Sequence, residues 1–207
     1  MPNFLFEKSI KGEVVGIDEV GRGSWAGPVV SCAVLIRGKK IESELFHLIE
    51  DSKKLSSISR MNIYKKIIDD RSFVTGVGVS SVDEIDKLNI QEATFLSMKR
   101  AFDNLRASNP GDIELVLVDG NKAPKFDCNV KCIIRGDQKS LSISSASIVA
   151  KVTRDKIMIN LSEKFPGYGW ETNMGYGTNK HKEALIKLGI NNLHRKTFKP
   201  IRSILEK

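Results

Sequence analysis

The sequence lacks the features that would place the chain in a membrane or direct it out of the cell. No run of apolar residues approaches the ~18 that suggest a membrane-spanning helix. The first 13 residues carry Glu7, Lys8 and Lys11 among a few apolar residues, without the apolar region or cleavage site of a secretion signal. We therefore expect a cytoplasmic protein that does not contact membranes.

Cysteine is also scarce. The chain has three cysteines, Cys32, Cys128 and Cys132, and an odd number without a secretion signal favours reduced thiols over disulfides. Cys128 and Cys132 stand four residues apart, as in half of a zinc site. No second pair and no neighbouring histidine completes that set, so we do not expect structural zinc.

Internal repeats, low-complexity stretches and linkers are absent from the sequence as well. The 207 residues are 41% hydrophobic and 28% charged, which excludes a disordered, collagen-like or coiled-coil chain. This length is typical of one domain. We expect residues 1–207 to form a single domain and the protein to be a monomer.

Positive charge is in excess, with a net charge of +8. Most of it lies between residues 180 and 207, where eight basic residues accompany two acidic ones. Charge alone leaves two interpretations open for this helical segment, which begins at about residue 179: a surface for a polyanion, or a solvated helix face. On the first interpretation, Arg195, Lys196 and Lys199 contact nucleic-acid phosphates and supply affinity without sequence preference.

The spacing of apolar residues predicts an α/β fold. Short apolar or alternating runs predict strands at residues 13–17, 29–36, 73–79, 114–118 and 131–135. Helical spacing predicts helices at residues 59–68, 83–88, 91–106, 142–165 and 179–188, with a glycine- and aromatic-rich loop at 167–177. Because strands come first and later alternate with helices, we expect a mixed sheet with helices on its faces.

Two of these strands lead into carboxylates. Asp18 and Glu19 follow the first strand, and Asp119 follows the strand at 114–118. One acid in this position is typical of the beginning of a loop, but the carboxyl ends of neighbouring strands converge where α/β sheets bind ligands. Clustered carboxylates resist ionisation without a cation, and oxygen ligands suit Mg²⁺ or Mn²⁺. With a basic surface, the pattern indicates phosphodiester chemistry by a two-metal mechanism.

A dinucleotide-binding turn is the competing interpretation of the same region. Gly21, Gly23 and Ala26 have the spacing of that fingerprint after a strand. The two preceding acids would repel a pyrophosphate, and residues 27–28 (GP) lead into another strand where the fingerprint needs a helix. We therefore disfavour it.

Several motifs occur together in the order typical of one family. They are residues 17–23 (IDEVGRG) with 27–28 (GP), 51–55 (DSKKL), 118–121 (VDGN), 136–140 (GDQKS), 145–155 (SASIVAKVTRD) and 175–181 (GYGTNKH). In these motifs, which span roughly residues 13 to 200, the chain resembles ribonuclease HII. The resemblance implies a catalytic domain of the ribonuclease H fold, a five-stranded mixed sheet flanked by helices.

The resemblance also implies an activity. Members of the family are endonucleases that cut the RNA strand of RNA–DNA hybrids. They also incise on the 5′ side of a single ribonucleotide in duplex DNA, leaving 3′-hydroxyl and 5′-phosphate ends, as in ribonucleotide excision repair. By motif, the metal ligands, for Mg²⁺ or Mn²⁺, fall on Asp18, Glu19, Asp119 and Asp137.

The substrate-binding positions follow from the same motifs. Gly21, Arg22 and Gly23 match the turn that senses the 2′-hydroxyl, the group that distinguishes RNA from DNA. Lys53 falls in a matching motif, and Tyr176 matches an aromatic residue that packs on the next deoxyribose. Without the resemblance, Tyr176 would be interpreted as a packed loop aromatic. Residues 173–174 (NM) depart from the family, where many relatives carry basic residues.

Asp155 shares a helical stripe with Ile148, Val152 and Ile159, so we expect it to point toward the core. A buried acid needs a partner. We interpret it as a supporting carboxylate rather than a fifth metal ligand. Two other functions are disfavoured. Acids at all four metal positions argue against a non-catalytic hybrid-binding module, and the Gly-Arg-Gly turn with Tyr176 argues against a resolvase.

Overall fold

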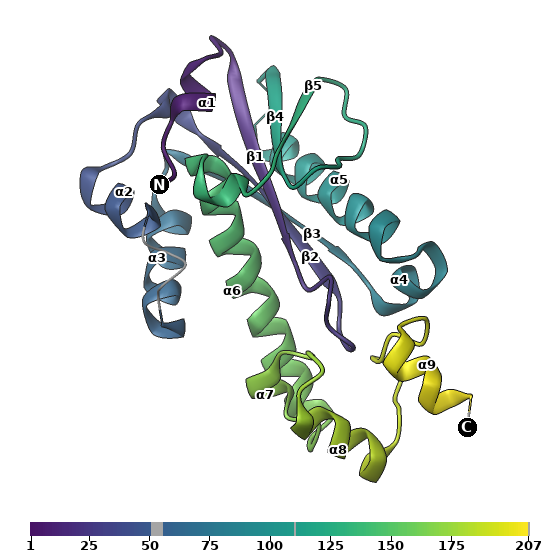
Figure 1. The fold of residues 1–207 in the computed structure, drawn as a ribbon. Coiled ribbons are helices and arrows are strands. Elements are labelled where there is room, and N and C mark those ends of the chain that lie inside the picture. The colour runs from purple at the N-terminus through teal and green to yellow at the C-terminus, as the bar shows by residue number, and fades with distance from the viewer. Residues whose placement is uncertain (51–55, 110, 207) are drawn as a thin grey trace.

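A five-stranded mixed sheet forms the centre of the protein in the computed structural model, which describes residues 1–50, 56–109 and 111–206 (Figure 1). Its strand order is β3-β2-β1-β4-β5. The strands are β1 (Glu13–Val20), β2 (Val29–Ile36), β3 (Phe73–Ser80), β4 (Ile113–Asp119) and β5 (Asn129–Ile133). β2 is antiparallel to β1 and β3, whereas β4 is parallel to β1 and β5. The predicted mixed sheet is therefore confirmed.

Helices cover both faces of the sheet. One face carries α4 (Val82–Leu88) and α5 (Ile90–Ser108), and the other carries α2 (Ser43–Glu50), α3 (Ser57–Asp69) and α6 (Leu141–Lys164). The remaining helices are α1 (Leu5–Lys8), α7 (Trp170–Asn173), α8 (Asn179–Leu188) and α9 (Lys199–Leu205), with 3₁₀ turns η1 (Arg37–Lys39) and η3 (Gly136–Gln138). α7 and α8 lie at the end of α6 that extends away from the sheet (Figure 1).

Long periodic segments match their predicted ranges closely, and the short helix α4 was predicted as well, but four other short helices were missed. The predicted helix at 179–188 is α8, and the strand at 29–36 is β2. The predictions did not include α1, α2 and α9, and they left α7 inside a loop. These helices span 4 to 8 residues, too few for a helical period to stand out. β1 also runs three residues past its predicted end, so Asp18 and Glu19 lie within the strand.

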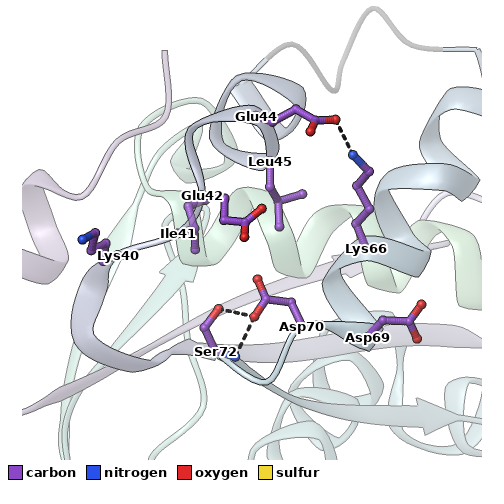
Figure 2. A pocket seen from close by; sticks show the side chains of 9 residues that line it. All are labelled: Lys40, Ile41, Glu42, Glu44, Leu45, Lys66, Asp69, Asp70 and Ser72. Carbon is purple, nitrogen blue, oxygen red and sulfur yellow. Dashed lines mark hydrogen bonds and ion pairs between the residues drawn. The ribbon is translucent and has the colours of Figure 1, made fainter.

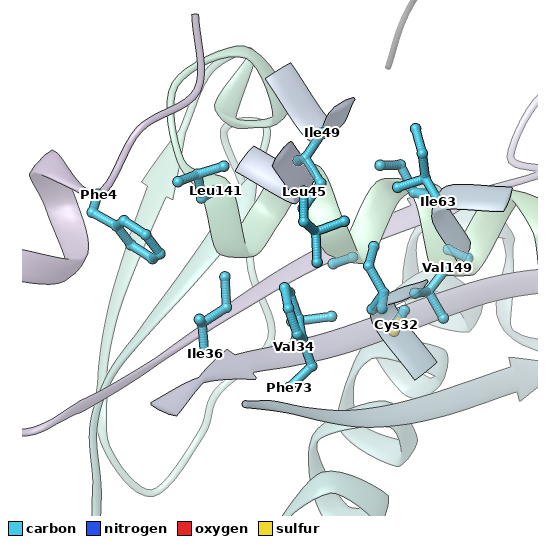
Figure 3. Packing of buried hydrophobic residues seen from close by; sticks show 14 residues of the cluster. Phe4, Cys32, Val34, Ile36, Leu45, Ile49, Ile63, Phe73, Leu141 and Val149 are labelled. Atoms are coloured by element: carbon cyan, nitrogen blue, oxygen red, sulfur yellow. The ribbon is translucent and has the colours of Figure 1, made fainter. Parts of the chain in front are cut away.

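The core consists of two apolar layers on either side of β1 and β2. Every residue of β2 is buried, and Figure 3 shows Cys32, Val34 and Ile36 packing against side chains of α2, α3 and α6. α6 begins directly over β1. The two elements are so close that a Cβ at Gly16 would collide with the backbone of residues 142–143. Glycine at this position therefore allows α6 to pack closely beside the acidic end of β1.

A separate apolar cluster joins the C-terminal part of the chain to the sheet. Ala26, Met158, Trp170, Leu185 and Ile201 are its most buried members. The cluster fixes the loop after α6 against the turn between β1 and β2. Among the described residues, no helix is both long and apolar enough to cross a membrane.

Candidate active site

Strand pairing brings the first three acids together. The parallel pairing of β1 with β4 ends at Ile17 and Val118, so the next residue on each strand is an acid, Asp18 or Asp119. β1 continues beside β2 through Glu19. The acids therefore meet where the central strands of the sheet separate, as the sequence predicted.

The fourth predicted acid is joined to this group through the backbone. Asp137 lies in η3, which begins three residues after the end of β5. The neighbouring Gly136 donates its N–H to Asp119 Oδ1 at 2.6 Å. Asp119 is therefore hydrogen-bonded to the residue that directly precedes Asp137.

Burial and mutual repulsion disfavour negative charge at this site. The pKa of Asp18, which is 6% exposed, is raised by burial and then by the charges of Glu19 and Asp119, against a lowering hydrogen bond from Ser147. The pKa of Glu19 is also raised, first by burial, although Arg22 opposes the shift. Acids in this state gain stability when a cation binds between them.

The donor set suits a divalent cation, although the side chains do not form a ready cage. Across residues 1–50, 56–109 and 111–206, no three Asp, Glu, His or Cys side chains are grouped closely enough to hold a metal. Arg22 Nη1 holds Glu19 Oε1 at 3.2 Å, and Gly136 holds Asp119. Glu19 Oε2, however, is buried without a hydrogen-bond partner. An orphaned carboxylate oxygen among repelling acids fits Mg²⁺ or Mn²⁺.

These acids open onto a cleft of ≈ 390 Å³. Glu19, Arg22 and Asp119 line it together with Gln91 and Thr94 of α5. The loop after β4 completes the wall with its residues 120–122. The cleft thus joins one acid from each of the two sequence motifs, and α5 is a wall that the sequence did not lead us to expect.

Another hollow, of ≈ 670 Å³, is lined by none of these four acids (Figure 2). It is formed by the segment before α2, by α2 and α3, and by the turn into β3. Two pairs of its polar residues bind one another: Lys66 pairs with Glu44, and Asp70 accepts hydrogen bonds from Ser72. None of the predicted site residues lines it, whereas Glu19, Arg22 and Asp119 line the cleft described above.

Two buried arginines hold the Gly-Arg-Gly turn. Arg195 is fully buried and donates to the carbonyls of Gly21, Arg22 and Gly27 at 2.6 to 3.0 Å. The prediction that Arg195 contacts phosphate is therefore wrong, because its guanidinium is buried and donates its hydrogen bonds to backbone carbonyls. Lys196 and Lys199, its partners in that prediction, are exposed.

Arg154 supports the turn from the side of α6. Its guanidinium is also fully buried and donates to the carbonyls of Ala26, Pro28 and Met174 and to the Ser24 hydroxyl, at 2.7 to 3.2 Å. Gly21 has φ +93°, and a Cβ there would collide with this guanidinium. The turn therefore needs glycine both for its backbone angle and for the space that Arg154 occupies.

Tyr176 lies against the same turn. A Cβ at Gly23 would be 3.9 Å from Tyr176 Cε1, and the carbonyl of Gly175 accepts hydrogen bonds from Trp25 and Ala26. The ring is 37% exposed, so its face is accessible. The structure thus brings together the turn and the aromatic residue that the resemblance paired, although they are separated by about 150 residues in the sequence.

A buried histidine pair supports the backbone of Tyr176. His181 Nδ1 donates to the Tyr176 carbonyl at 3.0 Å, so its Nε2 is the acceptor that faces Trp170 and His194, each at 3.2 Å. Both rings are fully buried. Burial lowers the pKa of His181, and burial followed by the charge of His181 lowers the pKa of His194 from 6.5 to about 4. Both rings are therefore neutral at pH 7.

Two further sequence predictions have different outcomes. Lys53 lies outside the described residues. Asp155 is partly buried, and its Oδ1 accepts from Lys151 Nζ at 2.8 Å, one helical turn earlier. Its supporting role stays a prediction. The expected apolar stripe ends early, since Ile159 is 41% exposed.

Arg154 was not among the residues predicted for the site, and the structure places it on the buried side of α6. A signal was present, because Ala146, Ala150, Arg154 and Met158 recur every four residues and all are fully buried. Arg195 carries no comparable signal, since it lies among exposed basic residues.

Comparison with known proteins gives the family. The sequence model described as Ribonuclease HII matches residues 15–201. The chain belongs to the ribonuclease HII family. It is 46% identical to "Ribonuclease HII" of Rhodospirillum rubrum over 205 residues, which cover 99% of this chain and 92% of that protein. The family resemblance stated from the sequence is confirmed.

Solved structures of this family and of the same fold agree. The crystal structure of the ribonuclease H2 from Pyrococcus horikoshii matches with a TM-score of 0.78 and 28% identity, covering 94% of this chain and 97% of that one. A structure of Bst-RNase HIII in complex with Mn²⁺ matches in fold with a TM-score of 0.73 and 18% identity, covering 100% of this chain and 73% of that one. This ribonuclease HII is accordingly an endoribonuclease that acts on the RNA of RNA–DNA hybrids, with a divalent-metal requirement.

The buried position of Arg195 predicts a large effect on stability. We expect Arg195→Ala to lower the free energy of unfolding by about 2–4 kcal/mol, because it leaves buried carbonyls without donors. Arg195→Lys recovers part of the loss, since one ammonium cannot reproduce the fork. Urea denaturation measures both.

The exposed lysines serve as matched controls for this comparison. Lys196→Ala and Lys199→Ala should change stability by less than about 0.5 kcal/mol. If they contact phosphate, each should reduce the slope of log K against log salt by roughly one. A stable Arg195→Ala protein with a reduced salt slope would restore the phosphate-binding interpretation of Arg195.

The histidine pair predicts acid sensitivity around Tyr176. A folded-state pKa below 6.5 means that protonation favours the unfolded state, so the stabilisation is complete above pH 6.5 and is lost as the pH falls toward about 4. Both tryptophans of the chain, Trp25 and Trp170, lie within 6.2 Å of the His181 ring, so their fluorescence should change over this range. His194→Asn should move the transition to lower pH. His47→Ala, at an exposed histidine, should not.

Proposed function

We propose that this ribonuclease HII incises duplex DNA on the 5′ side of a single embedded ribonucleotide, leaving 3′-hydroxyl and 5′-phosphate ends. The observation that carries the proposal is that Tyr176 lies close to the Gly-Arg-Gly turn, whose Arg22 lines the acidic cleft. A turn whose backbone approaches a ribose and a ring that packs on the following deoxyribose together select an RNA-to-DNA junction.

We assign metal binding to Asp18, Glu19, Asp119 and Asp137. Two divalent ions held there would activate water and stabilise the leaving oxygen. The chain's own contribution is the fixed placement of the oxygens: strand pairing sets Asp18 and Asp119, and the Gly136 amide orients Asp119. A solved structure of the same fold was obtained in complex with Mn²⁺, which supports the choice of ion.

Arg22 has two roles in this proposal. Its side chain is 50% exposed, reaches the cleft and pairs with Glu19. It therefore limits the repulsion that Glu19 experiences before metal binds, in keeping with the direction of its effect on the Glu19 pKa. A cation at the mouth of an acidic cleft also offers a contact to the incoming phosphate.

The metal assignment predicts the behaviour of Asp119→Asn. This variant preserves the shape of the side chain and its oxygen acceptor, but it removes one ligand charge. We expect cleavage to fall by at least about 10³-fold, with unchanged stability and substrate affinity. The test is cleavage of a single-ribonucleotide duplex in Mg²⁺ and in Mn²⁺, with urea denaturation as the control. Cleavage near the wild-type rate would overturn the metal assignment.

The junction assignment predicts a substrate-dependent effect of Tyr176→Ala. We expect the loss of cleavage to be about tenfold greater on a duplex with one ribonucleotide than on a long RNA–DNA hybrid, because the hybrid has a 2′-hydroxyl at the next position as well. Both substrates are measured at fixed salt and Mg²⁺. Tyr64→Ala, on α3 and outside the cleft, is the control and should affect both substrates alike. Equal losses for Tyr176→Ala would leave that residue a packing aromatic.

A further inference from the structure

A buried carboxylate outside the family's matched segment reaches the loop that carries Asp137. Glu7 belongs to α1, whereas the family match begins at residue 15. Its side chain is 2% exposed, and Oε1 accepts from Ser140 Oγ at 2.6 Å, Ser142 Oγ at 2.7 Å and Ser142 N at 3.1 Å. Within the described part of the chain, Glu7 forms no ion pair.

The first turn of α6 stabilises the Glu7 carboxylate in place of a basic side chain. Ser140 is the N-cap of α6, so the carboxylate lies at the N-terminus of a 24-residue helix. The helix dipole and three hydrogen bonds from this first turn stabilise a negative charge there. These hydrogen bonds to Oε1 offset part of the cost of burying Glu7, whose Oε2 is buried without a hydrogen-bond partner, and they do so only while residues 140–142 hold this arrangement.

A continuous path of hydrogen bonds connects Glu7 with the metal-binding acids. Ser140, held by Glu7 through its hydroxyl, donates its N–H to the Gly136 carbonyl at 2.8 Å. Gly136 in turn donates its own N–H to Asp119 Oδ1 at 2.6 Å. Asp137 lies inside the turn that these bonds close.

The backbone of the N-terminal segment (residues 3–7) reinforces this path. Asn3 donates to the Lys139 carbonyl at 3.2 Å and accepts from the Leu141 N–H at 3.1 Å. The segment therefore brackets Ser140 on both sides. The loop between β5 and α6 is held from outside the sheet by residues that precede β1.

We infer that Glu7 is a positioning residue for the metal site, acting through Ser140 and η3 on Asp137 and Asp119. The inference rests on the proposed function, in which these two acids bind metal. Groups that orient metal ligands influence metal affinity without touching the ion, with typical effects of about 10- to 100-fold. Glu7 should therefore affect the metal more than the nucleic acid.

The test compares Glu7→Ala and Glu7→Gln. Mn²⁺ binding is measured by calorimetric titration of the protein alone, and kcat, KM and the free energy of unfolding are measured in parallel. We expect Glu7→Ala to weaken Mn²⁺ binding by about tenfold and to lower kcat, with little change in KM. Glu7→Gln retains an acceptor oxygen and should recover most of the Mn²⁺ affinity. If Glu7→Ala does not fold, Ser140→Ala interrupts the same path one step later.

Three matched variants separate the possible explanations. Glu114→Ala removes another acid that accepts from a backbone N–H, at the opposite end of β4 from Asp119. Ile67→Ala destabilises the core from α3 and removes no hydrogen bond of the path. Both should leave Mn²⁺ affinity unchanged. Asp119→Asn should abolish strong Mn²⁺ binding.

The outcomes distinguish the inference from the proposed function. If Asp119→Asn loses Mn²⁺ binding while Glu7→Ala and Ser140→Ala retain it, the positioning role is overturned and the proposed metal site stands. The positioning role is also overturned if Ile67→Ala, at equal loss of stability, weakens Mn²⁺ binding as much as Glu7→Ala does. If Asp119→Asn binds Mn²⁺ normally, both the metal site and the positioning role are overturned.

Discussion

The two buried guanidiniums of Arg154 and Arg195 fix the geometry on which the candidate site depends. Neither forms an ion pair with a carboxylate among the described residues, and both are satisfied by backbone carbonyls and one hydroxyl. Burying an arginine is costly unless all its donors are used. If the carbonyls of the turn between β1 and β2 moved far, buried guanidinium donors would lose their hydrogen bonds. Their positions determine where the turn meets Tyr176.

The candidate site and the turn that supports it each contain buried side chains of like charge. Burial and repulsion raise the pKa of Asp18 and Glu19, whereas burial lowers the pKa of Arg154, and burial followed by the charge of Arg154 lowers the pKa of Arg195 to about 9. The folded chain thus disfavours the negative charge of the acids and the positive charge of the arginines. A bound cation would relieve the first, whereas the second is stabilised by the backbone carbonyls that the two arginines bind. The positive pair is therefore satisfied within the folded chain, whereas the negative pair is not.

The features that could be predicted from the sequence are those encoded locally. Buried strands such as β2 and β4 are indicated by their apolar runs, and the convergence of Asp18 with Asp119 follows from two parallel strands that each lead into an acid. Arg195 could not be placed in this way, because its burial depends on the turn at residues 21–27, more than 160 residues earlier. Local composition pointed to a solvent-exposed basic segment. Only the tertiary contacts show that one of its members is interior.

The same distinction explains why both ends of the chain converge on the site. β1 and β4 can fix Asp18 and Asp119, because sheet hydrogen bonds determine the positions of both. Asp137 and the Gly-Arg-Gly turn follow strand ends, where the sheet provides no further partners. The C-terminal part provides hydrogen-bond partners to the turn through Arg195. The N-terminal part reaches η3 through Glu7, which binds Ser140, the residue that donates to the Gly136 carbonyl. Loops that must hold a metal ligand or a ribose within a fraction of an ångström need such external support. In this fold, that support comes from charged side chains buried at helix ends and turns, where backbone dipoles can stabilise them.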